Sequence, residues 1–169
     1  PTANEGQIVT FGIRPDRAET GYGWLELPSK LSDNLAPVAQ PLSSFVEKPE
    51  AETADVLLRG GMHLWNAGIF LFSTSNILTS FEQHAPQTLA EVHNAFGAAE
   101  ADLGFTRLAA EPWSRLEDIS IDYAVMEHAS NLSVMPYDGY WSDLGDWQAI
   151  WREGEADSFC LLYTSDAAD

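Results

Sequence analysis

The sequence predicts an α/β domain, because segments typical of strands and segments typical of helices are mixed along the chain. Of the 169 residues, 45% are hydrophobic and six are tryptophan, so the chain can bury a substantial core. An acidic disordered segment would be poor in these residue types. The length fits one domain, or part of a larger one.

Four segments have strand character. Residues 8–13 form a β-rich run, and residues 24–27 alternate between apolar and polar side chains, as in a strand with one face in water. Residues 44–47 form a third strand that ends before Pro49, which has no amide proton for a sheet. Residues 67–72 carry few polar atoms, and we expect a buried strand there.

Two more segments connect these elements. Residues 28–43 contain three prolines and are predicted as a loop. Residues 132–137 and the pair Tyr140-Trp141 flank Asp138-Gly139, which predicts a β-hairpin.

Helical spacing and helix-capping residues predict five helices. They are residues 50–59, stopped by Gly60-Gly61; a helix capped by Thr74 or Ser75 that runs to His84; one opened by Pro86; one capped by Ser120; and one capped by Asp146 that carries Trp147, Ile150 and Trp151 on one face.

The charge argues against polyanionic partners. Eight Lys and Arg face 26 Asp and Glu, a net charge of −18, so we expect neither nucleic-acid nor membrane-surface binding. No apolar run approaches the ~20 residues that span a bilayer, and no secretory signal is visible. The single Cys160 cannot form an internal disulfide, which favours a reducing, cytoplasmic location.

The last residues differ in character from the rest. Residues 158–169 follow the acidic stretch Glu153-Gly154-Glu155 and show no clear periodicity. We therefore expect one domain over residues 1–157, followed by a tail that is disordered or foreign to the domain.

Glu47 and Lys48 stand at the end of a predicted strand, and Lys48 is one of only two lysines. A carboxylate accepts hydrogen bonds from hydroxyl groups, while an ammonium group binds phosphate as a compact charge. The pair is therefore a candidate site for a phosphorylated, hydroxyl-bearing ligand. A solvated ion pair at a strand end is the alternative interpretation.

Two further segments suit a polar ligand. Asn66, in Trp65-Asn66-Ala67-Gly68, can both donate to and accept from hydroxyl groups, and the alternative is an asparagine in a turn. Gly21-Tyr22-Gly23 is typical of a tight turn, whose exposed amides could also bind ligand oxygens.

Asp143 and Asp146 lie in a predicted turn between a strand and a helix. Mg²⁺ favours one or two protein carboxylates, with substrate phosphates and water completing its shell. Asp146 stands at a helix N-cap, so Asp143 is the better candidate for a metal ligand. The four histidines show no ligand spacing, and no Ser-His-Asp, Cys-His or phosphate-binding glycine loop is present.

Six motifs in order give the chain a resemblance to the bacterial mannose-1-phosphate guanylyltransferase family, also called GDP-mannose pyrophosphorylases. The resemblance covers roughly residues 6–152, and the six motifs together are specific although each occurs more widely among sugar-nucleotide pyrophosphorylases. The motifs are Val9-Thr10-Phe11-Gly12-Ile13, Glu19-Thr20-Gly21-Tyr22-Gly23, Phe45-Val46-Glu47-Lys48-Pro49, Trp65-Asn66-Ala67-Gly68-Ile69-Phe70, Ser120-Ile121-Asp122-Tyr123-Ala124-Val125-Met126-Glu127 and Trp141-Ser142-Asp143-Leu144-Gly145-Asp146-Trp147.

The resemblance implies a Rossmann-like α/β nucleotidyltransferase, with a glycosyltransferase-A-like mixed sheet flanked by helices, that converts GTP and mannose 1-phosphate to GDP-mannose and diphosphate. It implies that Glu47 holds mannose hydroxyls and Lys48 the sugar phosphate. Asn66 and the backbone at Gly23 would line the sugar pocket, and Asp143 would be one of two aspartates that hold Mg²⁺.

The family's Arg-containing glycine-rich loop does not occur in this sequence. Apart from Gly145-Asp146 in the last of the six motifs, no Gly-Asp pair is present to serve as the family's second metal motif. We therefore expect the chain to be the sugar-phosphate half of an incomplete catalytic domain, unable to catalyse the reaction alone. The alternatives are a pyrophosphorylase for another sugar 1-phosphate, such as glucose, and a non-catalytic regulatory or binding paralogue. The oligomeric state stays open, a homo-oligomer of the intact protein included.

Overall fold

The structure is a computed structural model that describes residues 6–32, 36–145 and 147–154. The chain divides into two compact units, Pro1–Asp138 and Gly139–Asp169, and each is described by itself. The tail expected over residues 158–169 lies outside the described residues. The fold of the first unit is α/β, as the sequence predicts.

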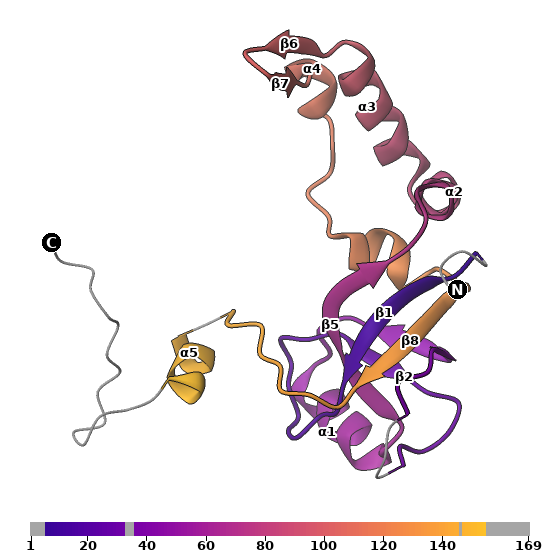
Figure 1. The fold of residues 1–169 in the computed structure, drawn as a ribbon, viewed down its shortest axis with the longest axis vertical. Coiled ribbons are helices and arrows are strands. Elements are labelled where there is room, and N and C mark those ends of the chain that lie inside the picture. The colour runs from indigo at the N-terminus through magenta and orange to yellow at the C-terminus, as the bar shows by residue number, and fades with distance from the viewer. Residues whose placement is uncertain (1–5, 33–35, 146, 155–169) are drawn as a thin grey trace, which may run out of the picture. The chain divides into compact units, whose positions relative to one another are not determined.

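A six-stranded mixed sheet forms the centre of the first unit, in the order β3-β8-β1-β5-β2-β4. Strand β8 runs parallel to β1, and the other neighbours are antiparallel. Figure 1 shows β1, β5 and β8 side by side. The strands are β1 (Ile8–Ile13), β2 (Trp24–Glu26), β3 (Gln40–Pro41), β4 (Ser44–Val46), β5 (His63–Leu71) and β8 (Leu132–Tyr137).

The sheet is strongly curled, so that its two edge strands, β3 and β4, are consecutive in sequence. Strands β3 and β4 occupy opposite ends of the strand order, yet only Leu42 and Ser43 separate them in sequence. The Leu42 amide donates to the carbonyl of Leu132 in β8 at 3.2 Å, and the Ser43 amide donates to that of Glu26 in β2 at 2.9 Å. The segment expected to be all loop over residues 28–43 therefore contains a short strand, β3.

The core lies between the sheet and the π-helical turn η2 (Asp122–Met126). Its fully buried members come from four strands and from that turn, so residues distant in sequence share one apolar cluster. They are Ile8, Leu25, Leu64, Val134, Val125 and Met126, each 0% exposed.

Strand β5 is longer than predicted, and it is buried in its first half, before the residues 67–72 for which burial was expected. Residues 63–66 are buried, whereas Ile69 is 53% and Leu71 is 56% exposed. Strand β2 covers only residues 63–65, so within the described residues the second half of β5 has its neighbour β1 but no strand on the other side. The expectation of a buried strand over residues 67–72 was wrong on burial.

The hairpin expected over residues 132–141 is absent. Strand β8 instead pairs in parallel with β1, from Ile8 opposite Leu132 to Ile13 opposite Tyr137. Tyr140 and Trp141 belong to no strand. The Asp138-Gly139 turn signal is local, and the pairing with β1 across the fold prevails over it.

Helix signals in the sequence were mostly correct. Helix α1 (Ala51–Gly60) ends at Gly61, whose φ of 66° is the left-handed conformation that glycine adopts readily. Helix α2 (Thr74–His84) is capped by Ser73, one residue before the predicted caps, and α3 (Pro86–Gly97) opens on Pro86. The helix expected after Ser120 is the π-helical turn η2, and α5 (Trp147–Glu153) lies in the second unit.

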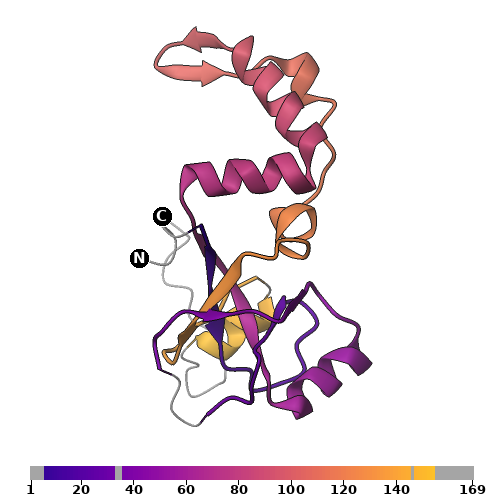
Figure 2. The same cartoon turned by 90° about the vertical axis from the view of Figure 1, so that its right-hand side faces the viewer.

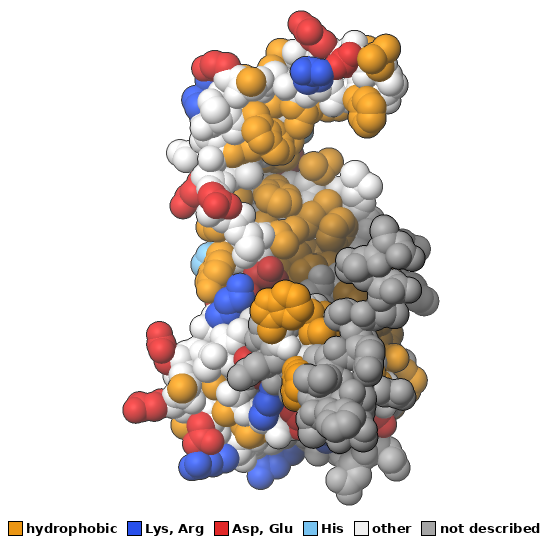
Figure 3. Space-filling model, turned by 90° about the vertical axis from the view of Figure 1, so that its left-hand side faces the viewer, with side chains coloured by type: hydrophobic (Ala, Val, Ile, Leu, Met, Phe, Trp, Pro, Cys, Tyr) orange, Lys and Arg blue, Asp and Glu red, His pale blue; other side chains and the backbone are white. Residues whose placement is uncertain are grey.

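Residues 100–113 form elements that the sequence analysis did not predict. They are β6 (Glu100–Asp102), β7 (Phe105–Arg107) and α4 (Ala110–Trp113), and β6 and β7 make a separate two-stranded sheet. Figure 2 shows α2, α3 and these elements extending from the end of β5, away from the six-stranded sheet. Figure 3 shows hydrophobic side chains gathered on the face of this region that it displays. Phe96 of α3 and Phe105 of β7 are 66% and 76% exposed.

Candidate functional site

The structure brings together four of the predicted site residues: Gly23, Glu47, Lys48 and Asn66. Gly23 immediately precedes β2, Glu47 and Lys48 follow β4, and Asn66 lies in β5. Because β2 pairs with both β4 and β5, these residues meet where β2 begins and β4 ends, beside the interior of β5. The backbone amide of Asn66 donates to the Gly23 carbonyl at 2.7 Å.

Gly23 allows a close approach that no other residue would permit. A Cβ atom at this position would lie 2.6 Å from Oε2 of Glu47 and 3.2 Å from Cβ of Asn66. A contact of 2.6 Å essentially never occurs at a real Cβ atom, so any substitution must displace the Glu47 carboxylate or the backbone. The sequence analysis expected exposed backbone groups at Gly23. In the structure Gly23 is buried and its carbonyl accepts from the Asn66 backbone amide, so the role that the structure supports is this steric one.

Glu47 carries a buried carboxylate with spare hydrogen-bonding capacity. Its side chain is only 7% exposed, and its Oε1 lies 3.6 Å from Nζ of Lys48. Its Oε2 has no hydrogen-bond partner within the part of the chain that the structure describes. Burial raises the pKa of Glu47, and the nearby charge of Asp122 adds to this effect, while Lys48 opposes it. A hydroxyl donor brought to Oε2 would satisfy a group that is costly to leave unpaired.

Lys48 directs its ammonium group to the same side of the chain as the Glu47 carboxylate. Consecutive side chains of an extended strand point to opposite faces, so an ordinary strand would separate the two groups. Lys48 has a φ of 44°, a left-handed conformation that is uncommon outside glycine. Its side chain is 55% exposed, so the ammonium group can meet an anion from solvent.

Asn66 is held by bonds on both ends of its side chain. Its Oδ1 accepts from the hydroxyl of Thr10 at 2.7 Å and from the amide of Gly68 at 3.1 Å. Its Nδ2 donates to Oδ1 of Asp122 at 3.2 Å. In the part of the chain that the structure describes, Nδ2 makes this one bond, so its second hydrogen can serve as a donor in a fixed direction. Thr10, fully buried in β1, was not predicted as a site residue.

Two carboxylates that the sequence analysis did not assign complete this group. Asp122 bonds to Asn66, and Oε1 of Glu127 accepts from the backbone amide of Glu47 at 2.9 Å. Burial raises the pKa of Asp122, Glu127 adds to the effect, and the hydrogen bond from Asn66 and the charge of Lys48 oppose it. The motif over residues 120–127 contains both side chains and was the only sequence feature that could have pointed to them. It does not show their partners, because both contact residues that are distant in sequence.

The packed side chains of Tyr22, Trp65 and Arg17 support the loop before β2. Trp65 contacts Tyr22 edge to face at 5.3 Å, and the guanidinium carbon of Arg17 lies 4.7 Å from the Trp65 ring centroid. Arg17 is paired at 3.0 Å with Glu19, whose other oxygen accepts from the Gly21 amide. These contacts fix the Gly21-Tyr22-Gly23 loop beside Glu47.

Asp143, the predicted metal ligand, lies in the second unit. It is exposed, and its Oδ1 accepts from the Gly145 amide at 3.2 Å in a tight turn. Among the described residues, no group of three or more His, Cys, Asp or Glu side chains is placed to hold a metal ion. Mg²⁺ can be held by one or two carboxylates and substrate phosphates, so Asp143 fits as a single ligand.

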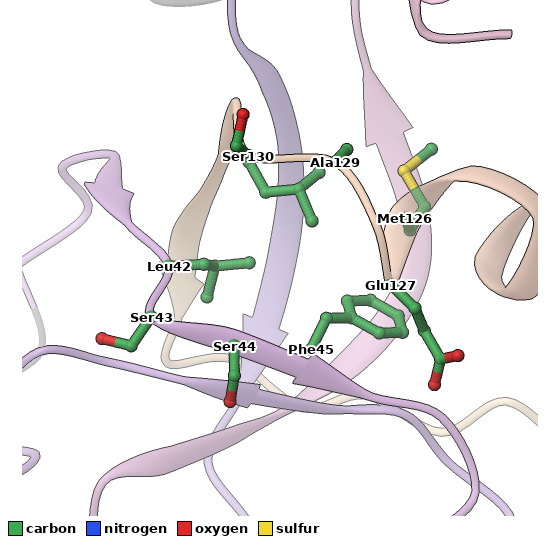
Figure 4. A pocket seen from close by; sticks show the side chains of 9 residues that line it. Leu42, Ser43, Ser44, Phe45, Met126, Glu127, Ala129 and Ser130 are labelled. Carbon is green, nitrogen blue, oxygen red and sulfur yellow. The ribbon is translucent and has the colours of Figure 1, made fainter. Parts of the chain in front are cut away.

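A cavity of about 360 Å³ lies beside the site, inside the curl of the sheet. Leu42, Phe45 and Met126 provide apolar walls, and Ser43, Ser44 and Ser130 provide hydroxyls. Figure 4 shows Glu127 at its margin, with a carboxylate that points away from Leu42 and the serines. Glu127 therefore lines the cavity and also belongs to the group around Glu47, whose backbone amide it accepts from.

Comparisons with known proteins agree on one family. The sequence profile of the family described as nucleotidyl transferase matches residues 1–158. A mannose-1-phosphate guanylyltransferase of Sinorhizobium fredii is 44% identical over 153 residues, which are 90% of this chain and 29% of that protein. One from Escherichia coli K12 is 38% identical over 152 residues, again 90% of this chain and 32% of that protein.

Solved structures share the fold. The chain matches a mannose-6-phosphate isomerase from Helicobacter pylori with a TM-score of 0.72 and 30% identity, over 84% of this chain and 54% of that one. It matches a mannose-1-phosphate geranyltransferase from Thermus thermophilus with a TM-score of 0.71 and 33% identity, over 89% of this chain and 41% of that one. The chain thus spans about a third of the curated relatives and about half of these structures. Among the described residues, no helix has the length and apolar character to cross a membrane.

Proposed function

The chain belongs to the nucleotidyl transferase family, and we propose that it forms the sugar-phosphate site of a mannose-1-phosphate guanylyltransferase. In this reaction a phosphate oxygen of mannose 1-phosphate attacks the α-phosphorus of GTP. The bond from the α-phosphorus to the bridging oxygen breaks, diphosphate leaves, and GDP-mannose is formed. The proposal is supported by the names of the relatives and by the group formed by Gly23, Glu47, Lys48 and Asn66.

The observation that carries the proposal is the unpartnered Oε2 of Glu47 beside the ammonium group of Lys48. A sugar 1-phosphate presents hydroxyl donors and a dianionic phosphate a few ångströms apart. Glu47 can accept from a hydroxyl while Lys48 contacts the phosphate, so one ligand would satisfy both groups. A solvated ion pair accounts less well for a carboxylate that is 7% exposed.

The residues of this chain would act mainly by positioning the acceptor. Both reactants are anions, and catalysis therefore depends on neutralising and aligning them rather than on a covalent intermediate. Lys48 would neutralise part of the charge on the attacking phosphate and hold it in place. Asp143 would hold Mg²⁺, which supplies further neutralisation of the phosphates when bound.

Isothermal titration of the 169-residue chain with mannose 1-phosphate tests the site directly. We expect saturable binding, weaker binding of glucose 1-phosphate, and little binding of mannose or inorganic phosphate alone. Absence of binding would refute the site, and equal affinity for the glucose ester would refute the mannose assignment. Pyrophosphate release from GTP by a polypeptide that carries the whole catalytic domain, dependent on mannose 1-phosphate, would then separate an enzyme from a non-catalytic paralogue.

Lys48→Ala should weaken mannose 1-phosphate binding roughly 10- to 100-fold, because a hydrogen bond to a charged group contributes about 1.5–3 kcal/mol. The chain offers a matched control, since Lys30 is its only other lysine and is exposed. Lys30→Ala should leave the affinity unchanged. An equal loss in both variants would show that net charge, not the position of Lys48, governs binding.

A further inference from the structure

We infer that Glu127 is a positioning residue that holds the Glu47-Lys48 segment in its ligand-binding conformation through the backbone amide of Glu47. The inference rests on the proposed function, and it assigns Glu127 a role apart from contact with the ligand. The central observation is the hydrogen bond from the Glu47 amide to Oε1 of Glu127, at 2.9 Å between residues 80 positions apart.

The π-helical turn explains how Glu127 reaches this position. In an α-helix, residues five apart lie on nearly opposite sides, about 140° around the axis. Here the Glu127 amide donates to the Asp122 carbonyl at 2.9 Å, a bond that spans five residues and closes a wider turn. Asp122 can therefore contact Asn66 while Glu127 contacts the Glu47 amide, and both carboxylates serve the same group.

The backbone of the segment needs such support. Lys48 is left-handed, with a φ of 44°, and it directly precedes Pro49, whose ring further restricts the residue before it. Strained conformations persist only where the surroundings hold them. The hydrogen bond that the Glu47 amide donates to Glu127 fixes the Val46–Glu47 peptide, one residue before Lys48. The left-handed conformation of Lys48 then places its ammonium group beside the Glu47 carboxylate.

The charge of Glu127 is not what this role requires. Glu127 contributes to the raised pKa of both Glu47 and Asp122, so its negative charge disfavours the ionised forms of its neighbours. A glutamine would still offer an oxygen to the Glu47 amide and would remove that repulsion. A positioning role and a charge role therefore predict opposite results for glutamine.

The test compares Glu127→Gln and Glu127→Ala in the 169-residue chain, with Glu82→Ala on the exposed surface of α2 as a matched control. Hydrogen exchange of the Glu47 amide, followed by NMR, measures how well its hydrogen bond to Glu127 is kept in the absence of any ligand. We expect exchange within about threefold of the wild type for Glu127→Gln and Glu82→Ala. For Glu127→Ala we expect it to be at least tenfold faster, with the overall fold retained by circular dichroism.

Titration with mannose 1-phosphate gives the second readout. We expect at least a tenfold loss of affinity in Glu127→Ala and near wild-type affinity in Glu127→Gln. An equal loss in both variants would overturn the inference in favour of a charge role, and unchanged amide exchange in Glu127→Ala would overturn it directly. If the wild-type chain does not bind mannose 1-phosphate, the proposed function fails, while the exchange data still decide whether Glu127 holds the Glu47 peptide.

Discussion

At the residue scale, Gly23 shows how the site depends on the absence of a side chain. The Cβ atom of an alanine at this position would lie 2.6 Å from Oε2 of Glu47. We expect Gly23→Ala to displace that carboxylate, to cost about 1–3 kcal/mol of unfolding free energy, and to abolish measurable mannose 1-phosphate binding. Chemical denaturation and titration calorimetry measure the two effects.

Gly97 provides the matched control for this substitution. It is the last residue of α3, and a Cβ atom there would meet no heavy atom within 4 Å in the described structure. Gly97→Ala should stabilise the chain by about 0.5–1 kcal/mol and leave ligand binding unchanged. If both alanine variants lost binding alike, the steric account of Gly23 would be wrong.

Glu47 links ligand binding to a pH-dependent cost in stability. Its pKa is raised above the ordinary value of 4.5, chiefly by burial, so the folded state favours the protonated form. The stability from this protonation is fully present below pH 4.5 and is lost as the pH rises through the raised pKa. The ionised carboxylate is therefore unfavourable to folding at neutral pH.

Glu47→Gln should be more stable than the wild type at pH 7, by on the order of 1 kcal/mol, because it removes a buried charge. The difference should shrink as the pH falls below the raised pKa of Glu47. Denaturation midpoints measured from pH 4 to pH 8 check this, and a difference that stays constant with pH would contradict it. The same variant should bind mannose 1-phosphate poorly, which would make Glu47 a site where function opposes stability.

At the scale of single elements, β5 allows one substitution to be tested in two environments. Leu64 is fully buried, whereas Leu71, near the other end of the same strand, is 56% exposed. Leu64→Ala should cost about 2–5 kcal/mol through lost burial and a residual cavity. Leu71→Ala should cost only about 0.5–1 kcal/mol, and equal losses in chemical denaturation would contradict the burial difference along β5.

The elements predicted well are those with local signals. Strand β1 is rich in β-forming residues, α1 is stopped by Gly61, and α3 opens on Pro86, and each feature acts within one turn or one strand. The failures depend on distant partners: β3 exists because its two residues pair with β8, and residues 132–137 pair with β1 rather than with residues 140–141. Periodicity carries no information on which strand will be the neighbour.

The candidate site divides in the same way. Glu47, Lys48, Asn66 and Gly23 were expected together from motifs, and the structure brings them together where β2 begins and β4 ends, beside the interior of β5. Thr10, Asp122 and Glu127 were missed as site residues, because their bonds join positions 56 and 80 residues apart. The role of Glu127 also depends on a π-helical turn, which the sequence analysis predicted as an ordinary helix.

At the scale of the whole molecule, the net charge of −18 sets how the chain responds to salt. Cations are few, and several are already engaged in surface ion pairs, such as those of Arg59 with Asp55 and Arg115 with Glu91. Each exposed pair contributes little, whereas the repulsion among the excess carboxylates acts over the whole surface. The electrostatic balance in the folded state is therefore unfavourable at neutral pH.

Added salt should stabilise the chain, because it screens this repulsion more than it weakens the exposed pairs. We expect Tm at pH 7 to rise by a few degrees, on the order of 3 °C, between about 10 and 150 mM NaCl. The same increase in salt should have almost no effect near the sequence pI of about 4.2, where the net charge vanishes. Thermal melts at both pH values measure this, and a Tm that falls with salt at pH 7 would show that attractive ion pairs outweigh the excess negative charge.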